Sequence, residues 1–408
     1  MRAMSASASR SQLPLAAPPG SVCLLRLSAI GDVCHTVPVV RTLQAVWPQT
    51  RLTWIIGRLE AELVGDLPGV EFIVYDKAGG VRAWWELQRR LRRRRFEVLL
   101  HMQAALRANL VALCVRAPLR LGFDRARARD LQWLCTNARI AASPRAHVID
   151  GLFAFLQALG VRERVLRWEI PIPEAARARA RRWLGPPEAD GGPPLLVISP
   201  CASERWNNFR DWPPERYAAV AEHAARSYGA RVVLTGGPSA RERRAAARIG
   251  AAAPGIELVD LVGRTGLKEL LAILERARAL VAPDSGPLHL ADALGVPAIG
   301  LFATSNPQRT GPVRDARWIV NRYPDAVRAA FGREVEEIRW GRRVRDPAAM
   351  DRVTVADVIE RLDAVFARAP RPGPLAPSTA PGPGGPGLQR TTPAVSGQAH
   401  AGTGHGEP

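Results

Sequence analysis

The chain has 408 residues, enough for more than one domain, and its 57 Lys and Arg against 38 Asp and Glu give a formal net charge of +19. Such a charge usually indicates nucleic acid or an anionic membrane as a partner. Only Lys77 and Lys268 are lysines, however, and the excess of arginine with abundant Ala, Gly and Pro is typical of a GC-rich genome. No basic stretch interleaved with aromatics and no helix-turn-helix pattern favours nucleic acid.

The five cysteines are scattered and include no C-x-x-C pair, which argues against a disulfide framework and against a zinc site. A reduced, cytoplasmic setting fits this pattern. Residues 1–20 are rich in Ser, Ala and Pro but lack the apolar core of a signal peptide, and no run of about 18 apolar residues occurs elsewhere. The sequence therefore predicts neither export nor a membrane span.

Apolar runs of strand length alternate with amphipathic helical stretches, which predicts doubly wound α/β sheets. The expected strands of the first series span residues 24–30, 52–57, 72–75, 96–100 and 119–123. Those of the second series span residues 195–199, 231–235, 256–261, 280–282 and 296–301. We therefore expect two Rossmann-like domains, at residues 21–183 and 195–350, joined by a Pro- and Gly-rich linker at 184–194.

The ends of the chain differ from this alternating pattern. Thr354 and Asp357 form a capping motif before an apolar face, which predicts a C-terminal helix within residues 351–369. Residues 1–20 and 370–408 have compositions that cannot bury a core, and we expect a disordered extension and a disordered tail.

Asp32 follows the first expected strand and precedes an amphipathic stretch. Its carboxylate is therefore expected at a strand-to-helix turn, where open α/β sheets bind ligands. An aspartate soon after a glycine is also a common helix N-cap, so a structural and a chemical role are both open.

The segment from Ala279 to Phe302 predicts a strand, a tight turn, a short helix and a second strand. Pro287 suits the first turn of the helix, and the free N–H groups near Ser285 and Gly286 would face a ligand. A helix start of this kind suits a diphosphate, although an ordinary capped turn would show the same residues.

Four motifs in register resemble glycosyltransferase family 9, the heptosyltransferases that build the inner core of bacterial lipopolysaccharide. The motifs are S-A-I-G-D-V-x-H-T-x-P from Ser28, W-P-P-E-R-Y from Trp212, L-T-G-G-P from Leu234 and P-D-S-G-P-L-H-L-A from Pro283. The resemblance implies a GT-B fold, in which an N-terminal acceptor-side domain and a C-terminal donor-binding domain face a central cleft. It also implies that the C-terminal helix packs back on the N-terminal domain.

The implied reaction is an inverting transfer of heptose from ADP-heptose to Kdo-lipid A or a core heptose. ADP-heptose is the substrate, and no cofactor or metal is expected. A sugar hydroxyl is a poor nucleophile near neutral pH, so a carboxylate must accept its proton, and Asp32 is the expected base. Two alternatives stay open: a GT-B enzyme with another nucleotide sugar, and a non-catalytic regulator that binds sugar nucleotides.

The departing nucleoside diphosphate gains negative charge, so the donor side needs positive charge and oriented N–H groups. The candidate donor-binding residues are Ser203, Arg210, Gly236, Gly237, Asp284, Ser285, Gly286 and His289. The resemblance places Arg210 against the phosphates and Asp284 at hydroxyls of the donor sugar. Ala240 stands where some relatives have an acidic residue for a ribose hydroxyl, which leaves the nucleotide open, with Glu242 and Glu215 as substitutes.

The candidate acceptor-side residues are Ser28, Gly31, Gln103 and Arg107. Gln103 and Arg107 match a glutamine and a basic residue of the family, but His101 stands where an aspartate is usual. The identity of the acceptor is therefore not inferred from the family. The basic run at residues 89–95 fits a solvated helix face. It also fits a dock for a phosphorylated acceptor or for the anionic inner-membrane leaflet, which would make the protein peripheral at the cytoplasmic face.

Overall fold

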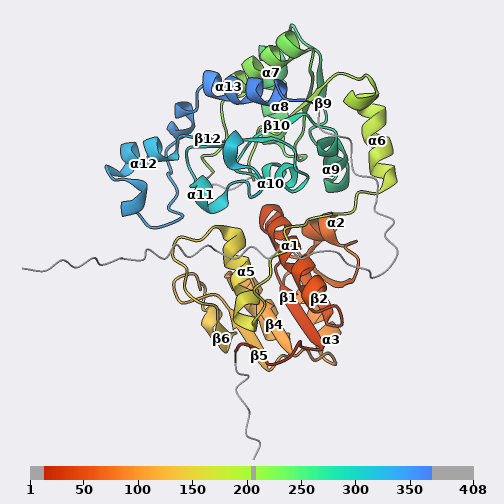
Figure 1. Ribbon diagram of the computed structural model, residues 1–408, viewed down its shortest axis with the longest axis vertical. Helices are drawn as coiled ribbons and strands as arrows, with labels where there is room; N and C mark the ends of the chain where they lie inside the picture. Colours follow the sequence, from red (N-terminus) through yellow and green to blue (C-terminus); the bar gives the residue numbers. More distant parts are fainter. Residues whose placement is uncertain (1–12, 204–207, 370–408) are drawn as a thin grey trace, which may run out of the picture. The chain divides into compact units, whose positions relative to one another are not determined.

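The computed structural model describes residues 13–203 and 208–369 (Figure 1). Its strands form two six-stranded sheets in which every pairing is parallel. Parallel neighbours need crossover connections, and the helices between the strands supply them. The predicted α/β class is therefore confirmed.

The first sheet has the strand order β3-β2-β1-β4-β5-β6. Its strands are β1 (Ser21–Leu25), β2 (Arg51–Gly57), β3 (Val70–Tyr75), β4 (Val98–His101), β5 (Leu119–Gly122) and β6 (Ala138–Arg139). Its helices are α1 (Ile30–Val46), α2 (Arg58–Val64), α3 (Gly80–Leu91), α4 (Leu106–Leu113) and α5 (Val148–Leu159). We call the elements from β1 to α5 the N-terminal half.

The second sheet has the order β12-β11-β10-β7-β8-β9. Its strands are β7 (Leu195–Ile198), β8 (Arg231–Leu234), β9 (Leu258–Asp260), β10 (Ala279–Pro283), β11 (Ala298–Phe302) and β12 (Val320–Asn321). The helices of this C-terminal half are α6 (Glu174–Leu184), α7 (Pro214–Tyr228), α8 (Ala240–Ala252), α9 (Leu267–Glu275), α10 (Gly286–Ala293), α11 (Pro307–Thr310), α12 (Tyr323–Phe331) and α13 (Val355–Phe366).

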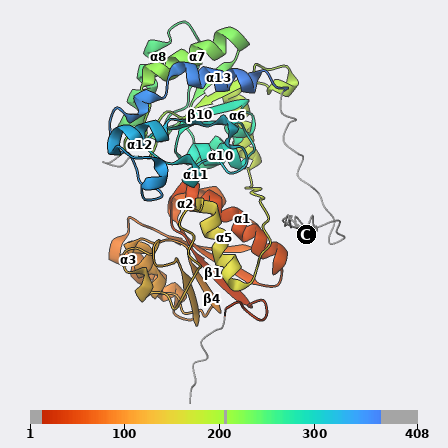
Figure 2. The same cartoon turned by 60° about the vertical axis from the view of Figure 1, so that its left-hand side comes forward.

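The central strands are buried along their whole length, as expected for parallel strands covered on both faces. One apolar cluster joins the two halves, because it includes Val33 and Val37 of α1 together with Leu288 and Leu290 of α10. Helices α1 and α10 lie side by side in Figures 1 and 2. The two turns that begin these helices are thus close to each other.

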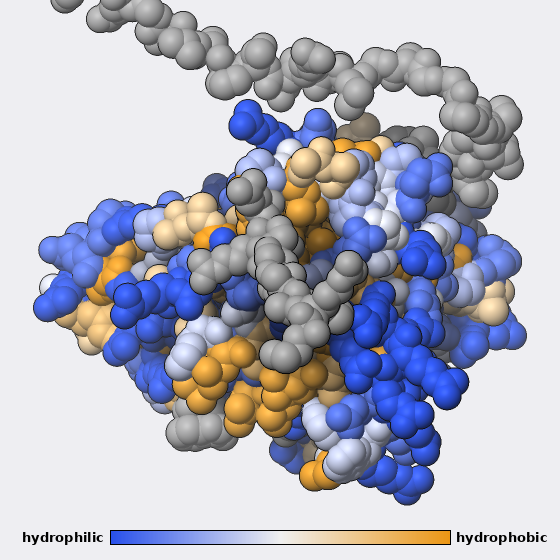
Figure 3. All heavy atoms as spheres, turned by 90° about the horizontal axis from the view of Figure 1, so that it is seen from below, coloured by the Kyte–Doolittle hydropathy of each residue, from blue (hydrophilic) through white to orange (hydrophobic). Residues whose placement is uncertain are grey.

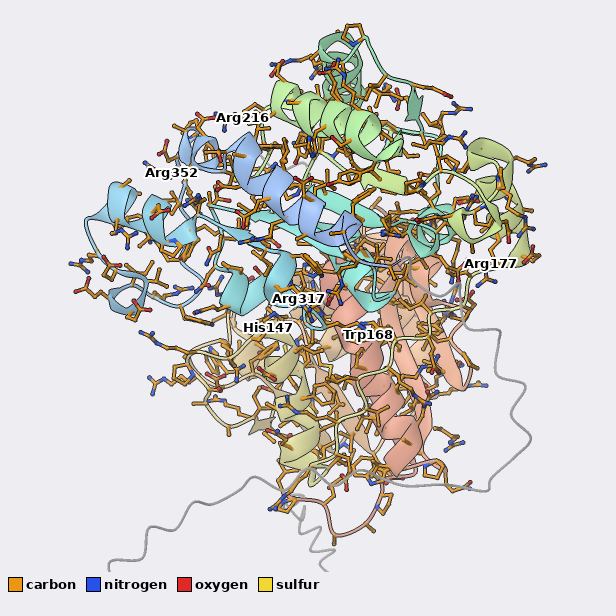
Figure 4. The ribbon with its side chains drawn as sticks, turned by 45° about the horizontal axis from the view of Figure 1, so that its top comes forward. His147, Trp168, Arg177, Arg216, Arg317 and Arg352 are labelled. Carbon is orange, nitrogen blue, oxygen red and sulfur yellow. The ribbon has the colours of Figure 1, made fainter. Side chains whose placement is uncertain are left out.

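The C-terminal helix does not pack as expected. Its main contacts are with α7, β11 and β12 of the C-terminal half, where Val358 and Leu362 complete the core around Trp212. Arg216 (labelled in Figure 4) and Trp212 also donate to the carbonyl of Val353 just before the helix, at 2.8 and 2.9 Å. The prediction that this helix packs on the N-terminal domain was wrong, because its apolar face is used by the nearer core.

The N-terminal extension also needs a correction. The Leu15 N–H donates to Leu159 O at 3.1 Å, and Thr50 Oγ1 donates to Pro19 O at 2.7 Å. Residues 13–20 are therefore bound to the first half, contrary to the expected disorder. Residues 1–12 and 370–408 lie outside the described residues, and the predicted domain boundaries stay a prediction.

Candidate active site

Asp32 lies one residue after Gly31 in the first turn of α1. The helix begins at Ile30 with Ala29 as its N-cap, so Asp32 is the third helical residue and not the N-cap. Its Oδ2 lies 2.5 Å from Arg26 Nη2 and 3.4 Å from the Ala29 N–H donor. About a third of the Asp32 side chain, 35%, stays exposed. The carboxylate is therefore fixed on one side and open on the other.

Gln103 fixes the loop that precedes this turn. Its Oε1 accepts from the N–H groups of Leu27 and Ser28 at 2.6 and 3.3 Å, and its Nε2 donates to Ser28 Oγ at 3.2 Å. Two of the expected acceptor-side residues, Ser28 and Gln103, are thus brought together next to Asp32. Arg107 is exposed on α4, and no hydrogen bond or ion pair joins its side chain to another described residue.

Arg210 gathers the donor-side candidates. Its buried guanidinium donates from Nη1 to Asp284 O at 2.7 Å and from Nη2 to Ser203 Oγ at 3.1 Å. Nη1 also lies 3.8 Å from Asp284 Oδ2. Ser203 and Asp284 follow β7 and β10, which are neighbours in the sheet, so the carboxyl ends of these strands place them together.

Asp284 is a buried carboxylate with several partners. Ser305 Oγ donates to its Oδ2 at 2.8 Å, and His289 Nε2 lies 3.8 Å from its Oδ1. Burial by itself would raise the pKa of Asp284, but His289, Arg210 and Ser305 outweigh it and hold that pKa below its ordinary value. Asp284 is therefore a stable anion and hydrogen-bond acceptor.

The start of α10 offers unused donors. Ser285 is the N-cap, and its buried Oγ has no hydrogen-bond partner among the described residues; the same holds for Nδ1 of His289. Buried polar atoms are almost always paired in folded proteins. Unpaired donors at a helix N-terminus suit an anionic ligand such as a diphosphate.

Gly31 and Gly286 allow the two turns to approach. A Cβ built on Gly31 would overlap Cδ2 of His289, and one on Gly286 would lie 3.2 Å from Ile30 Cγ2. Cys34 Sγ lies 3.6 Å from His289 O. The base candidate and the donor-side cluster are therefore parts of one site that both halves build.

Three histidines meet at this junction. The ring of His35 lies 4.7 Å from that of His289 and 5.7 Å from that of His147 (labelled in Figure 4). Burial, together with the neighbouring histidines, lowers the pKa of His35 well below its ordinary value. His35 is therefore neutral near pH 7, and its position in the first motif reflects packing between α1, α5 and α10.

The chain was compared with known proteins. A family model described as glycosyltransferase family 9 (heptosyltransferase) matches residues 84–334. The lipopolysaccharide core heptosyltransferase OpsX of Haemophilus influenzae is 35% identical over 344 residues, which cover 84% of this chain and 96% of that protein. This chain belongs to glycosyltransferase family 9. The resemblance found in the four motifs is confirmed, and the protein is a glycosyltransferase.

Solved structures of the family share its fold. The family 9 glycosyltransferase from Veillonella parvula superposes with a TM-score of 0.68 at 20% identity, covering 85% of this chain and 97% of that one. For the ADP-heptose heptosyltransferase II of E. coli the TM-score is 0.64 at 20% identity, covering 85% and 98%. The expected GT-B fold is thereby confirmed.

Two acidic residues considered for the ribose of a family 9 donor have other partners. Glu242 accepts from the Gly237 N–H at 2.9 Å and from Ser239 Oγ at 2.8 Å, so it shapes the turn after β8. Glu215 is exposed and pairs with Arg248 at 2.7 Å. Gly236 and Gly237 lie in the turn that Glu242 holds, and a Cβ on Gly237 would lie 2.9 Å from Glu242 Oε2.

The structure adds site residues that the motifs did not single out. Arg26 is buried and pairs with Asp32. An arginine within an otherwise apolar run could have indicated a functional residue, since burying a charge is costly. Ser305, in the loop that follows β11, donates to the Asp284 carboxylate. Arg309 on α11 lies near Asp32 and Asp284, and no local pattern distinguished it from the other arginines of this chain.

Within residues 13–203 and 208–369, no three His, Cys, Asp or Glu side chains converge as metal ligands. In that same part of the chain, no helix has the length and apolar character needed to cross a membrane.

Proposed function

We propose that this family 9 enzyme transfers heptose from ADP-heptose to the inner core of lipopolysaccharide, with Kdo-lipid A or a core heptose as acceptor. OpsX, at 35% identity, is a lipopolysaccharide core heptosyltransferase, and the E. coli structure is of an enzyme for ADP-heptose. The observation that carries the proposal is the packing of α1 on α10, which brings Asp32 and the Asp284–Ser285 turn into one site.

In the proposed mechanism, Asp32 accepts the proton of the acceptor hydroxyl while that oxygen bonds to the anomeric carbon of the donor. The bond from the anomeric carbon to the phosphate oxygen breaks on the opposite face, so the configuration inverts. The nucleoside diphosphate departs with the bonding electron pair. Arg210 and the N–H groups at the start of α10 stabilise this charge, and Asp284 binds hydroxyls of the heptose.

The surrounding contacts prepare these groups for their proposed roles. Arg26 orients the Asp32 carboxylate from its buried side, at 2.5 Å, and leaves the other side open to the acceptor. Arg210 is oriented by Ser203 and by the carbonyl of Asp284. Such preorganisation favours the transition state because no group has to move when charge develops.

A panel of nucleotide sugars tests the proposal. Purified protein is incubated with ADP-, GDP- and UDP-sugars, in separate reactions with Kdo-lipid A and with a core that already carries heptose, and nucleoside diphosphate release is measured. Asp32→Asn is the matched inactive control. We expect release from ADP-heptose only. A preference for another nucleotide would support the alternative glycosyltransferase, and binding without release in any combination would support the regulator.

We further propose peripheral contact with the anionic leaflet at the cytoplasmic face of the inner membrane. Helix α3 ends at Leu91, so only part of the basic run 89–95 is helical, and Arg92 to Arg95 are exposed beyond it. A hollow of about 750 Å³ lies beside them, lined by Arg89, Arg92, Trp85 and Leu113. In Figure 1 α3 lies at the lower end, and the view from below in Figure 3 shows apolar beside hydrophilic side chains. Basic and amphipathic groups together suit an anionic bilayer surface.

Liposome co-sedimentation tests this contact. Replacing Arg92, Arg93 and Arg94 by Gln should reduce binding to anionic liposomes, and the difference should vanish at high salt because of screening. The matched control removes the same charge from the C-terminal half by replacing the exposed residues Arg244, Arg333 and Arg352. Equal loss of binding in both triple variants would reject a specific membrane-binding surface at α3.

A further inference from the structure

Exposed apolar side chains are unevenly distributed over the described residues. The large ones all lie between residues 59 and 166, and the described part of the C-terminal half has none. Most of them come from α3, α4 and the short helix η1 (Gln132–Leu134). Apolar side chains that gather on one surface are typical of a site that contacts a partner or a membrane.

Helix α4 is apolar on its outer face as well as on its inner face. Leu106, Leu110 and Leu113 are 59%, 47% and 58% exposed, and their helical spacing places them on one side of α4. The inner face buries Ala108 and Val111 in the core beneath the first sheet. The three outer leucines belong to none of the apolar clusters of the described residues, so the packing of the core does not explain them.

Helix α3 extends this surface. Trp84 Nε1 donates to Leu110 O at 3.0 Å, which fixes α3 against α4. Trp85 meets the edge of Trp84, with 5.2 Å between the ring centroids, and is itself 59% exposed. Trp85 and Leu113 line the same hollow of about 750 Å³. The outer faces of the two helices are therefore continuous.

Helix η1 completes the surface. The Leu106 N–H donates to Asp130 Oδ2 at 3.0 Å, so the loop that leads into η1 is held at the start of α4. Trp133 and Leu134 of η1 are 53% and 60% exposed. We call the following six side chains the apolar face: Trp85, Leu106, Leu110, Leu113, Trp133 and Leu134.

Arginines lie beside the apolar face. Arg89, Arg92 and Arg116 line the hollow that α3 and α4 share, and no hydrogen bond or ion pair joins their guanidinium groups to another described residue. The carboxylate that lines this hollow, that of Glu86, is paired with Arg82 at 3.1 Å. An apolar surface with unpaired positive charge at its side is complementary to an anionic lipid layer, which is negative at its head groups and apolar below them.

The same charge argues against a second copy of this chain as the partner. A two-fold interface places the same patch on both subunits, so the arginines of the hollow would face one another. Like charges repel at short range, and Glu86 is already paired. Lipid phosphates would meet the same arginines with opposite charge.

We propose that the apolar face enters the hydrocarbon layer of the anionic leaflet, with the arginines of the hollow at the level of the lipid phosphates. The proposal rests on the proposed membrane contact and deepens it, because insertion adds salt-resistant binding to electrostatic attraction. Helix α4 begins three residues after Gln103, which holds the loop before Asp32. Insertion of α4 therefore brings the acceptor side of the proposed site to the surface where a lipid-anchored acceptor lies.

Vesicle co-sedimentation at two salt concentrations separates insertion from attraction. Full-length protein is mixed with vesicles of phosphatidylglycerol and phosphatidylethanolamine at about 0.1 M and about 1 M salt, where screening lengths are about 10 and 3 Å. Wild-type protein should keep part of its binding at the higher salt. The double variant Leu110→Gln, Leu113→Gln should partition at least about tenfold more weakly at both, because two leucine side chains are lost from the hydrocarbon.

The chain offers a matched control for this variant. Leu59 on α2 and Leu166 in the connection before α6 are 51% and 48% exposed, and neither belongs to the apolar face. Leu59→Gln with Leu166→Gln should bind vesicles as the wild type does. Glutamine is nearly as good a helix former as leucine, so both double variants should fold.

Equal partition of the two double variants would overturn insertion, and so would complete release of the wild type at about 1 M salt. Both results leave the electrostatic contact intact, which the replacement of Arg92, Arg93 and Arg94 tests separately. Wild-type protein that does not bind these vesicles even at low salt would overturn the membrane contact and insertion together.

Tryptophan fluorescence tests insertion by a second route. Lipids that carry bromine on their acyl chains quench tryptophans that reach the hydrocarbon. Trp85→Phe with Trp133→Phe keeps the surface apolar, so this variant should bind within a few-fold of the wild type and lose the quenching that the wild type shows. Unchanged quenching would overturn the assignment of these tryptophans to the lipid. A wild-type dimer in lipid-free solution that Leu110→Gln with Leu113→Gln dissociates would assign the apolar face to a second copy instead.

Discussion

The donor side and the acceptor side of the candidate site are built differently. Around Asp284, Arg210 donates to the carbonyl at 2.7 Å and Ser305 donates to the carboxylate at 2.8 Å, so the residue is held from two sides. Around Asp32, by contrast, Arg26 and the Ala29 N–H hold one side of the carboxylate, and 35% of the side chain stays exposed. The comparison indicates that Asp284 is held within a buried network, whereas Asp32 is held from one side and open on the other.

Asp32→Asn should have the largest effect. The amide keeps the size of the carboxylate but cannot accept the acceptor's proton, so we expect turnover to fall by about a hundredfold or more. Steady-state kinetics measures this loss, and calorimetry should find donor affinity within a few-fold of wild type. Turnover close to that of wild type would show that Asp32 is not the base and that its role is structural, through its contacts with Ala29 and Arg26.

Arg210→Ala tests the preorganised side directly. Loss of a charge-assisted contact should weaken binding of both ADP and ADP-heptose by about 1 to 3 kcal/mol. Calorimetry measures both ligands, and Arg244→Ala, an exposed arginine on α8, is the matched control. Unchanged affinity for both ligands would remove Arg210 from the diphosphate site.

Gly31→Ala tests whether the two sides need close contact. The added Cβ would overlap the ring of His289, and overpacking of this kind costs about 1 to 3 kcal/mol of stability. Gly250→Ala in α8 is the matched control, since a Cβ there meets nothing within 4 Å and the change should stabilise the helix by up to about 1 kcal/mol. Urea unfolding compares each variant with the wild type. If Gly31→Ala were as stable as the wild type, α10 would have to shift easily to accept the added Cβ.

The pH dependence of stability should reveal the buried histidines. Burial lowers the pKa of His101 to about 4, and it lowers that of His35 well below 6.5. Below about pH 6.5 the unfolded chain takes up protons at these residues and the folded chain does not, so stability should fall as the pH falls, by about 1.4 kcal/mol per pH unit for each histidine. Urea unfolding between pH 7 and 5 measures the slope.

His101→Gln should make that slope shallower, because it removes one of the groups that titrates only in the unfolded chain. An unchanged slope would mean that His101 takes up its proton in the folded protein as well.

Ending the chain at Ala369 should have the smallest effect. Residues beyond it have a composition that cannot offset the entropy of ordering, so neither side of the site should depend on them. We expect the melting temperature and the rate of ADP release to stay close to those of the full chain. A clear fall in either would contradict this expectation.

Sequence patterns placed the residues around Asp284 better than the residues around Asp32, for a physical reason. Asp284, Ser285 and His289 follow one strand within a single motif, so local periodicity places them together. Asp32 was placed at its turn in the same way. The strand itself ends at Leu25, earlier than the apolar run suggested, and the two-residue edge strands β6 and β12 gave no signal.

The position of Arg309 near Asp32 could not be predicted, because it depends on the packing of one half on the other. In a chain with so many arginines, its residue type carried no information. His101 shows a second limit of prediction from sequence. A departure from a family pattern does not show which interaction replaces the one that is lost. Only the hydrogen bond between its ring and Asn109 Oδ1 explains that histidine.

The contact between Gly31 and His289 constrains the exchange of halves between related enzymes. A chimera could take its first half from one relative and its second half from another. It would then need a glycine at the position of Gly31, which faces the His289 ring. Recombination at the connection before α6 should therefore succeed when the Gly31–His289 pair is inherited or grafted together, and donor choice would then follow the second parent.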